Sequence, residues 1–547
     1  MPKKYARILC IVAATVLIVI NLVGCSQPKD KSTDGTGDTS SENNLPSTTA
    51  TAGTGDTSTG NSLPIVKEPI TLKYWVGFNG SALKVLKNYN ECAAYQELEK
   101  RTGIHIDFIH PPVGQEKEQY QLMIASNDLT DIIEEYWNAT YPGGPDKAIS
   151  DGIYLKLNDY IDKYAPNYKK LIAANKGVAK QTITDAGNMW FFGAVTVDKT
   201  ASWSGPVFRK DWLDELGLQA PTTISEWYTV LKAFKQKGVE APYLLDSRGY
   251  PDYGSVIGAY GVGAWFYQVD NKVKYGPIEQ GYKDYLTEMN KWYKEGLIDK
   301  DFATRDRKAE DAMAISGKAG AWVGNYGQRI DTYMTAQKDD KNYALVAAPN
   351  PSLKPEDIPH FRQQDMPVSG AYKAVITTAC KYPVEAVKWM DYHYGEEGSR
   401  LFNWGVEDLS YKMVNGKPEF TEAVTKDPGG LPYDIINWKY KVHNGPYLVD
   451  PTATPPYSKE TEIAREVWTK AINDYALPST NMLPEESSEY SSIMSSINTL
   501  VSQMRLKFII GSEPLSKFDE YVNQVKKMNI ERAIQLQQAA LDRYNKK

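Results

Sequence analysis

The apolar and polar positions between residues 70 and 135 follow two alternating periods. Strands are expected at 70–75, at 104–109 and around Ile132–Ile133, and helices at 93–101 and 115–125. Alternation with a period of two indicates half-buried strands, and spacings of three and four indicate helices. Gly103 is expected to stop the first helix. This βαβαβ order predicts an α/β lobe with a largely parallel sheet.

The same rhythm continues toward the C-terminus. Helices are expected at 225–236, 280–295, 305–316, 514–528 and 530–544, and strands at 319–323 and 371–376. Thr223 or Ser225 can cap the first of these helices, and Pro514 suits the first turn of its own. Past Thr461 nearly all of the chain is expected to be helical. Two α/β lobes are predicted, with the chain crossing between them more than once and the carboxyl edges of their sheets facing a cleft.

The N-terminus has a different pattern. Three cations, Lys3, Lys4 and Arg7, precede an apolar run from Ile8 to Val23. The run is shorter than the about 20 apolar residues that a membrane-spanning helix needs. It is typical of a secretory signal, so residues 1–24 are predicted to be a signal peptide.

Cys25 is expected to carry lipid. Leu22-Val23-Gly24-Cys25 resembles the lipobox of bacterial lipoproteins, in which the cysteine thiol accepts a diacylglycerol. Two or more acyl chains anchor a protein stably. The alternative is a plain signal peptide followed by a chance cysteine. Ser26 follows the cysteine in place of an aspartate, so nothing here favours retention at an inner membrane.

Residues 25–66 read as a tether between the anchor and the folded body. They are rich in Ser, Thr, Gly, Asp and Asn, and GTGDTSSENNLP at Gly35 nearly repeats as GTGDTSTGNSLP at Gly53. Such a composition buries too little apolar surface to offset the entropy lost on ordering, so disorder is predicted.

Size and charge narrow the class of protein further. Roughly 480 residues follow the tether, which is enough for two lobes. Loss of the three N-terminal cations takes the formal net charge from −6 to −9. No basic stripe appears, so nucleic acid is not expected as a partner. Cys92 and Cys380 lie far apart and are expected to be buried free thiols, although an exported protein permits a disulfide.

Longer stretches of the body carry a family resemblance. They are YPGGP from Tyr141, KAISDGIYLKLNDYIDKYAPNY from Lys147, FRKDWLDELGL from Phe208, APTTISEWYTVLKAFK from Ala220, GKAGAWVGNYG from Gly317, NWGVE from Asn403 and FIIGSEPLSKFDEYV from Phe508. These stretches resemble the family 1 extracellular solute-binding proteins of sugar ABC importers, in the LplA-like Gram-positive lipoprotein branch. The resemblance extends from about Ile70 to Tyr544.

The resemblance implies a periplasmic-binding-protein-like type II fold, in which two α/β lobes joined by a hinge close over a ligand. Lobe 1 is expected to comprise 67–198 and 349–405, and lobe 2 is expected to comprise 199–348 and 406–547. Many relatives carry a calcium loop after the AFK helix, with oxygen ligands at alternate positions. The sequence here continues as QKGVEAP, so no metal is expected at this position. Asp246 and Asp252 are isolated candidates for a calcium ligand, and a solvated or capping role is the preferred interpretation of both. No cofactor is expected.

The chain has 37 Tyr and 13 Trp, and aromatic rings present a flat face to sugars and a polar edge to their hydroxyls. The expected ligand contacts are Trp75, Tyr136, Trp137, Asn138, Trp190, Trp203, Arg209, Trp265, Tyr267, Trp322, Asn325, Tyr326, Arg362 and Trp404. For each tryptophan, packing in the hydrophobic core is the alternative to a ligand contact. Arg209 pairs with Asp211 in the alternative interpretation. If Arg209 and Arg362 both faced the cleft, the expected ligand would be an acidic sugar.

No hydrolase, nucleotide-binding or zinc motif is present, and the five histidines are scattered without metal-ligand spacing. Neighbouring residues on a strand point to opposite faces, so Glu134 and Glu135 cannot act on one bond. These carboxylates and the pair Glu396 and Glu397 are interpreted as solvated surface charge.

The sequence therefore predicts a non-enzymatic, monomeric, lipid-anchored protein at the extracytoplasmic face of the cell membrane. It is expected to capture a carbohydrate, specifically an oligosaccharide, and to deliver it to the permease of an ABC importer. The alternatives are a cell-surface glycan-degrading lipoprotein (a lyase or glycosidase) and a sugar-sensing module for a membrane kinase.

Overall fold

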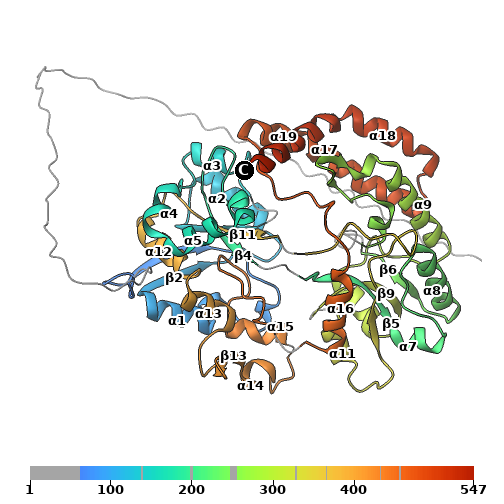
Figure 1. The fold of residues 1–547 in the computed structure, drawn as a ribbon, viewed down its shortest axis with the longest axis horizontal. Helices are drawn as coiled ribbons and strands as arrows, with labels where there is room; N and C mark the ends of the chain where they lie inside the picture. Colours follow the sequence, from blue (N-terminus) through green and yellow to red (C-terminus); the bar gives the residue numbers. More distant parts are fainter. Residues whose placement is uncertain are drawn as a thin grey trace, which may run out of the picture. The chain divides into compact units, whose positions relative to one another are not determined.

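The computed structural model describes residues 62–136, 140–197, 201–246, 255–326, 329–364, 366–431, 433–454 and 457–547. This part of the chain contains two open sheets, and helices pack on each of them to form separate hydrophobic cores (Figure 1). None of its helices combines the length and the apolar character that a membrane span requires.

The first sheet has the strand order β2 (Ile104–Ile109), β1 (Ile70–Trp75), β3 (Ile132–Glu135), β11 (Val368–Ile376) and β4 (Phe192–Val195). Strand β1 runs parallel to β2 and β3, which confirms the predicted βαβαβ opening. Strand β11 returns antiparallel to β3 and β4. A segment from the second half of the chain thus completes the sheet.

Helices from both halves of the chain pack on this sheet. They are α1 (Ala93–Thr102), α2 (Glu116–Ser126), α3 (Pro145–Ser150), α4 (Asn158–Tyr164), α5 (Pro166–Ala174), α6 (Lys176–Thr182), α12 (Pro383–Tyr392) and α13 (Glu396–Trp404). Gly103 caps α1 at φ 76°, in the left-handed conformation that glycine adopts without strain. Helix α12 contacts α4, and α13 contacts α1.

The second sheet has the order β10 (Leu345–Ala347), β5 (Ser204–Arg209), β9 (Ala319–Asn325) and β6 (Ala241–Leu244). Alternate residues of its strands enter different clusters: Phe208 and Ala321 lie in one, and Val207 and Trp322 lie in the other. This alternation follows from the period-2 geometry of a strand. The sheet is therefore covered on both faces.

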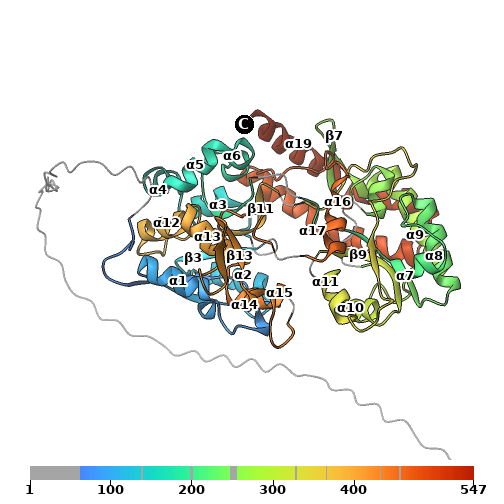
Figure 2. The same ribbon diagram turned by 60° about the horizontal axis from the view of Figure 1, so that its bottom comes forward.

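Helices of the second core fall into two groups, and Figure 2 shows the orange-red C-terminal helices beside the green ones. One cluster holds α8 (Ile224–Gln236), α9 (Gln280–Lys294), α17 (Pro484–Ile510), α18 (Phe518–Lys527) and α19 (Ile530–Lys546); the other holds α10 (Arg307–Ile315), α11 (Asp331–Ala336) and α16 (Lys459–Thr469). Helix α7 (Lys210–Glu215) follows β5. The predicted helical C-terminus is interrupted, because 470–483 contains no helix.

Smaller elements complete the described chain. They are the hairpins β7 (Phe266–Val269) with β8 (Lys272–Tyr275) and β12 (Tyr411–Val414) with β13 (Lys417–Phe420), and the short helices α14 (Glu422–Thr425) and α15 (Tyr433–Ile436). Core membership differs from the expected lobe boundaries at two places. Trp438, Val442 and Tyr447 pack in the first core, whereas Phe361 packs in the second. Cys92 and Cys380 are buried free thiols, as expected.

Candidate ligand-binding site

A pocket with a volume of about 160 Å³ lies at the carboxyl edge of the first sheet. Its lining comes from the residues that follow β1, from the end of β3, from β11 and from distant loops. The lining residues are Tyr74, Val76, Gly77, Phe78, Asn79, Gly80, Tyr89, Tyr95, Phe108, Val113, Glu116, Glu134, Tyr136, Tyr372 and Asn444. In open α/β sheets the carboxyl ends of the strands are the usual place for a ligand. The pocket therefore occupies the position that the fold favours.

Glu134 is the buried charged group of this pocket. Its carboxylate accepts a hydrogen bond of 2.6 Å from the Tyr74 hydroxyl, and the residue is 6% exposed. Burial raises the pKa of Glu134 to about 7, and the hydrogen bond from Tyr74 lowers it. Burying a carboxyl group costs free energy, and carboxyl groups that ionise near neutral pH are common at functional sites.

The interpretation of Glu134 and Glu135 as solvated charge is wrong, because both side chains are buried. Their opposite orientation, in contrast, is confirmed by their separate partners. Glu135 accepts hydrogen bonds from the hydroxyl of Tyr154 at 2.5 Å and from the backbone N–H of Tyr141 at 3.0 Å. Strand β3 thus directs one carboxylate into the pocket and the other into the core behind it. Glu396 and Glu397 are exposed, as expected.

Aromatic rings form the walls of the pocket. The Tyr89 ring stacks on Trp438 at 6.0 Å between centroids, with 6° between the planes. Phe78 stacks on His110 at 4.5 Å, and Tyr136 meets Tyr372 edge to face at 5.6 Å. Stacked and edge-to-face pairs of this kind fix flat apolar faces in place. The pocket therefore presents flat ring faces that neighbouring rings hold in place.

The backbone of Tyr372 is held at φ 60°, a conformation that L-residues with large side chains rarely adopt. Such a conformation persists only where surrounding contacts impose it, and it concentrates at binding sites. The strand pairing of β11 also shifts between Val368 and Lys373, so the irregularity coincides with the ring that lines the pocket.

A second group of expected residues meets at the end of the second sheet. Ser204 pairs with Asn325 in the β5–β9 ladder, and the backbone N–H of Tyr326 donates to the Trp203 carbonyl at 3.4 Å. Trp203, Asn325 and Tyr326 are thereby brought together. The Tyr326 ring meets Tyr457 at 5.3 Å, and the Arg465 guanidinium lies 5.3 Å from the Tyr326 ring.

Five expected contacts lie inside the cores. Trp75 and Trp190 belong to the first core, Tyr267 to the second, Trp322 to the cluster on the other face of the second sheet, and Trp404 to a small cluster with Tyr411. The indole N–H of Trp404 donates to Asp450 at 3.0 Å. These positions favour the core role over a ligand contact.

The two arginines are engaged with neighbouring groups. Arg209 is 5% exposed, bonds to both oxygens of Asp211 at 2.9 and 2.6 Å, and lies between the rings of Trp212 and Tyr343. The alternative pairing with Asp211 is thus confirmed. Arg362 donates to Gln364 at 2.7 Å and to the Thr469 carbonyl at 2.5 Å.

The remaining predicted positions are three ligand contacts and the lipidation site. Trp265 is half-buried against the second core. Trp137, Asn138 and Cys25 lie outside the described residues.

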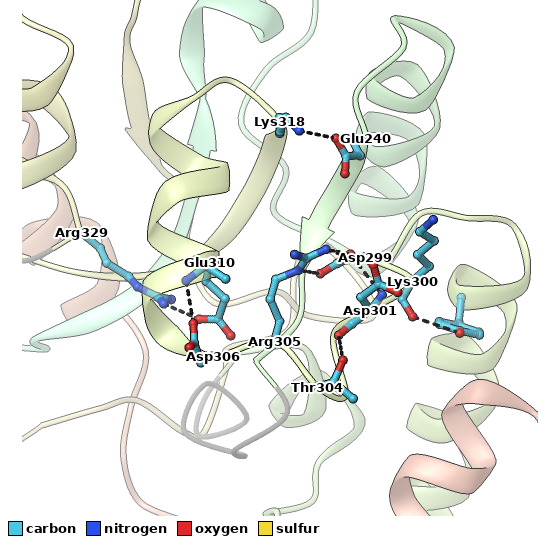
Figure 3. A network of polar contacts seen from close by, with 12 residues as sticks. Glu240, Asp299, Lys300, Asp301, Thr304, Arg305, Asp306, Glu310, Lys318 and Arg329 are labelled. Atoms are coloured by element: carbon cyan, nitrogen blue, oxygen red, sulfur yellow. Dashed lines mark hydrogen bonds and ion pairs between the residues drawn. The ribbon is translucent and has the colours of Figure 1, made fainter. Parts of the chain in front are cut away.

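Asp299 and Asp301, which follow α9 in the sequence, form ion pairs with Arg305. Figure 3 shows Arg305 beside Asp299 and Asp301, with its guanidinium 2.9 Å from an Asp299 oxygen and 3.4 Å from an Asp301 oxygen. In the part of the chain that the structure describes, no group of three or more His, Cys, Asp or Glu side chains is arranged to hold a metal ion. Asp246 is buried, and Asp252 lies outside this part.

Sequence reasoning missed most of the pocket. Of its lining residues, only Tyr136 was expected, and Tyr74, Tyr89, Glu134, Tyr372 and Asn444 were not. One signal for Glu134 was available: an acidic residue directly after two isoleucines, in a strand buried on both faces, must find a polar partner.

The arrangement of the two sheets has close parallels among solved structures. The structure of the alginate-binding protein AlgQ2 superposes with a TM-score of 0.73 at 23% identity, covering 87% of this chain and 99% of AlgQ2. The substrate-binding protein FusA of Streptococcus pneumoniae, solved in complex with kestose, superposes with a TM-score of 0.71 at 20% identity, covering 87% of this chain and 99% of FusA. The fold is therefore the periplasmic-binding-protein-like type II fold that was expected.

Sequence comparison specifies the family within this fold. The model described as bacterial extracellular solute-binding protein matches residues 88–399. Lipoprotein LipO of Bacillus subtilis (strain 168) is 25% identical over 458 residues, which are 79% of this chain and 85% of LipO. The fructooligosaccharide ABC transporter substrate-binding protein FusA of Streptococcus pneumoniae serotype 4 is 24% identical over 530 residues, which are 88% of this chain and 91% of FusA. The chain belongs to the bacterial extracellular solute-binding proteins.

Proposed function

We propose that this protein is the substrate-binding component of an ABC importer, and that it captures an oligosaccharide and delivers it to the permease. The observation that carries the proposal is the pocket at the carboxyl edge of the first sheet, with aromatic walls and the buried Glu134 carboxylate. Ring faces suit the C–H faces of a sugar, and a carboxylate accepts hydrogen bonds from its hydroxyls. The kestose bound by FusA supports the same class of ligand.

Capture is proposed to proceed by hinge closure between two lobes. Core membership supports lobe 1 as residues 67–197 with 366–454, and lobe 2 as 201–364 with 457–547. On these bounds the chain passes between the two lobes three times. The proposed contacts from lobe 2 are Trp203, Asn325 and Tyr326 at the end of the second sheet, with Arg465 of α16 beside the Tyr326 ring.

The mature protein is proposed to be a monomer held at the extracytoplasmic face of the membrane by lipid on Cys25, with the chain after Cys25 as the tether. The tether is shorter than the expected 25–66, because Ile65 and Val66 pack against the first core and the Ile65 N–H donates to the Thr102 carbonyl at 2.9 Å. The lipobox-like sequence supports this, as does the name of the relative LipO. Cys25→Ala should move the protein from the membrane fraction into the medium, whereas Cys380→Ala should leave it in place. Membrane retention of Cys25→Ala would contradict the anchor.

The capture step is tested by titration calorimetry on the chain from residue 25 with Cys25→Ser, using a panel of neutral and uronic-acid oligosaccharides. Each mixture is checked afterwards by chromatography. Binding of an intact sugar is expected. Cleaved products would indicate a glycan-degrading enzyme instead. Binding of an intact sugar without loss of its uptake in a deletion strain would point to the sensor role.

A further inference from the structure

We propose that the Glu134 pocket selects an uncharged sugar ring and rejects a ring that carries a carboxylate, with Glu134 as the specificity-determining residue. This inference rests on the proposed function, because it names the charge class of the ligand at the same site.

The charge of the pocket is the first argument. Among the described lining residues, Glu134 and Glu116 are the charged side chains, and no lysine or arginine accompanies them. Burial lowers the pKa of the nearby His110, so its ring is neutral around pH 7. The half-buried Lys373 approaches Glu135 and the rings of Trp190 and Phe191, which lie on the other side of the sheet. An anionic ring would meet carboxylates with no cation to offset them, and screening is weak in a buried site.

The hydrogen-bonding roles of the pocket are the second argument. Tyr74 directs its hydroxyl proton to Glu134, and Tyr89 directs its own to the Gly77 carbonyl at 3.4 Å. Two of the lining hydroxyls are thus committed as donors within the protein. The Glu134 carboxylate has lone pairs beyond the one that Tyr74 uses. The ionised Glu134 therefore needs a donor from the ligand group that lies against it. A sugar hydroxyl at this position supplies a proton, whereas an ionised carboxylate at the same position has none. A ligand that leaves this acceptor unmatched would be discriminated against strongly.

The fold leaves this choice open, which is why the side chains must decide it. FusA is named for fructooligosaccharides, which are neutral, and AlgQ2 is named for alginate, which is acidic. Both superpose on this chain with similar TM-scores of 0.71 and 0.73. Specificity between two such ligands is a difference of affinities that a repulsive group can supply.

The test compares one oligosaccharide in two charge states. Whichever neutral sugar of the panel binds is also prepared with its primary hydroxyls oxidised to carboxylates, and any acidic sugar that binds is also prepared with its carboxyls reduced. Affinities for both forms are measured by calorimetry at pH 7.5 and constant salt, on the chain with Cys25→Ser. The neutral form is expected to bind at least tenfold more tightly. Equal or tighter binding of the acidic form would overturn the inference and leave sugar capture standing, whereas no binding of any pair would overturn the proposed function itself.

Two variants assign the effect to one residue. Glu134→Gln keeps the shape and removes the charge, so it should reduce the preference to threefold or less. Glu118→Gln makes the same change of charge at an exposed position of α2 and should leave the preference unchanged. An unchanged preference in folded Glu134→Gln would overturn the role of Glu134.

A pH series on the unsubstituted pocket gives an answer even where Glu134→Gln fails to fold. Around Glu134 stand Tyr74, Tyr89, Tyr95, Tyr136, Tyr372, Asn444, Glu116 and the neutral His110. Uronic carboxylates stay ionised from pH 5.5 to 8.5. The preference for the neutral form should therefore grow across that range as Glu134 ionises. A preference that stays flat would contradict the assignment.

Discussion

Glu134 couples the ligand site to the stability of the fold. Its pKa lies well above the ordinary value of a glutamate because burial disfavours the charged carboxylate. Between that ordinary value and pH 7, the folded protein keeps a proton that the unfolded chain has already released. The free energy of unfolding therefore falls as the pH rises through this window. The fold tolerates this destabilising carboxyl at the base of the pocket, which is typical of a functional residue.

Glu134→Gln should remove this dependence. The unfolding free energy of the variant minus that of the unsubstituted protein should therefore increase from pH 4.5 to pH 7.5, by on the order of 2–3 kcal/mol. Urea titrations at the two pH values measure the difference. Glu118→Gln, on the exposed side of α2, should show a constant difference at both pH values. A constant difference for Glu134→Gln would mean that its carboxyl is not held in the neutral form near pH 6.

Trp322 and Tyr136 should respond oppositely to truncation. Trp322 is fully buried and packs on Tyr333 at 5.6 Å, so Trp322→Ala should cost about 3–5 kcal/mol of unfolding free energy. The folded fraction should still bind sugar. Tyr136 is half-buried in the pocket wall, so Tyr136→Ala should weaken binding at least tenfold and change stability less. Denaturant titration and calorimetry separate the two effects, and intact binding by Tyr136→Ala would remove this ring from the site.

At the scale of elements, local sequence patterns predicted most of the strands and helices that form the two cores. The strands at 70–75 and 104–109 were predicted with the bounds that the structure gives. Strand β9 was predicted to end at Val323 but continues to Asn325. That error moved Trp322 from the middle of a strand to its end, and it made a core residue look like a ligand contact. Tyr89, Tyr372 and Asn444 could not be predicted, because they reach the pocket from segments that lie far apart in the sequence.

Helix α8 allows a clean test of a predicted element end. Thr223 accepts from the Glu226 backbone N–H at 3.2 Å, and the Glu226 carboxylate accepts from the Thr223 N–H at 3.2 Å. Thr223→Ala breaks this capping box and should lower the unfolding free energy by about 1 kcal/mol. Thr229→Ala, at an exposed position of the same helix, should change it by less than about 0.5 kcal/mol. Equal effects of the two substitutions would contradict the cap.

At the scale of the whole molecule, the C-terminal helices link the two cores. Helix α17 contacts α9 in the second core and also α3 beside the first sheet. Arg543 of α19 pairs with Asp185, which lies between α6 and β4, and its guanidinium is 3.0 Å from Glu486 of α17. Lys547 also reaches Asp185, at 2.8 Å. A single guanidinium thus joins three segments that are far apart in the sequence.

Arg543→Gln should weaken this junction more than an ordinary ion pair would suggest. The Asp185 side chain is 2% exposed, so the substitution leaves a buried carboxylate with fewer partners, which typically costs several kcal/mol in the absence of a second cation. Because Lys547 remains, a smaller loss of about 1–2 kcal/mol is expected. Arg532→Gln on the same helix is the matched control: its pair with Glu489 is exposed on both sides and should be worth less than about 1 kcal/mol. Hydrogen exchange should show lost protection at 183–189 and in the first turns of α17 for Arg543→Gln alone. Equal exchange in both variants would mean that Arg543 does not hold the two cores together, and the coupling would then have to reside in the packing of α17 against α3.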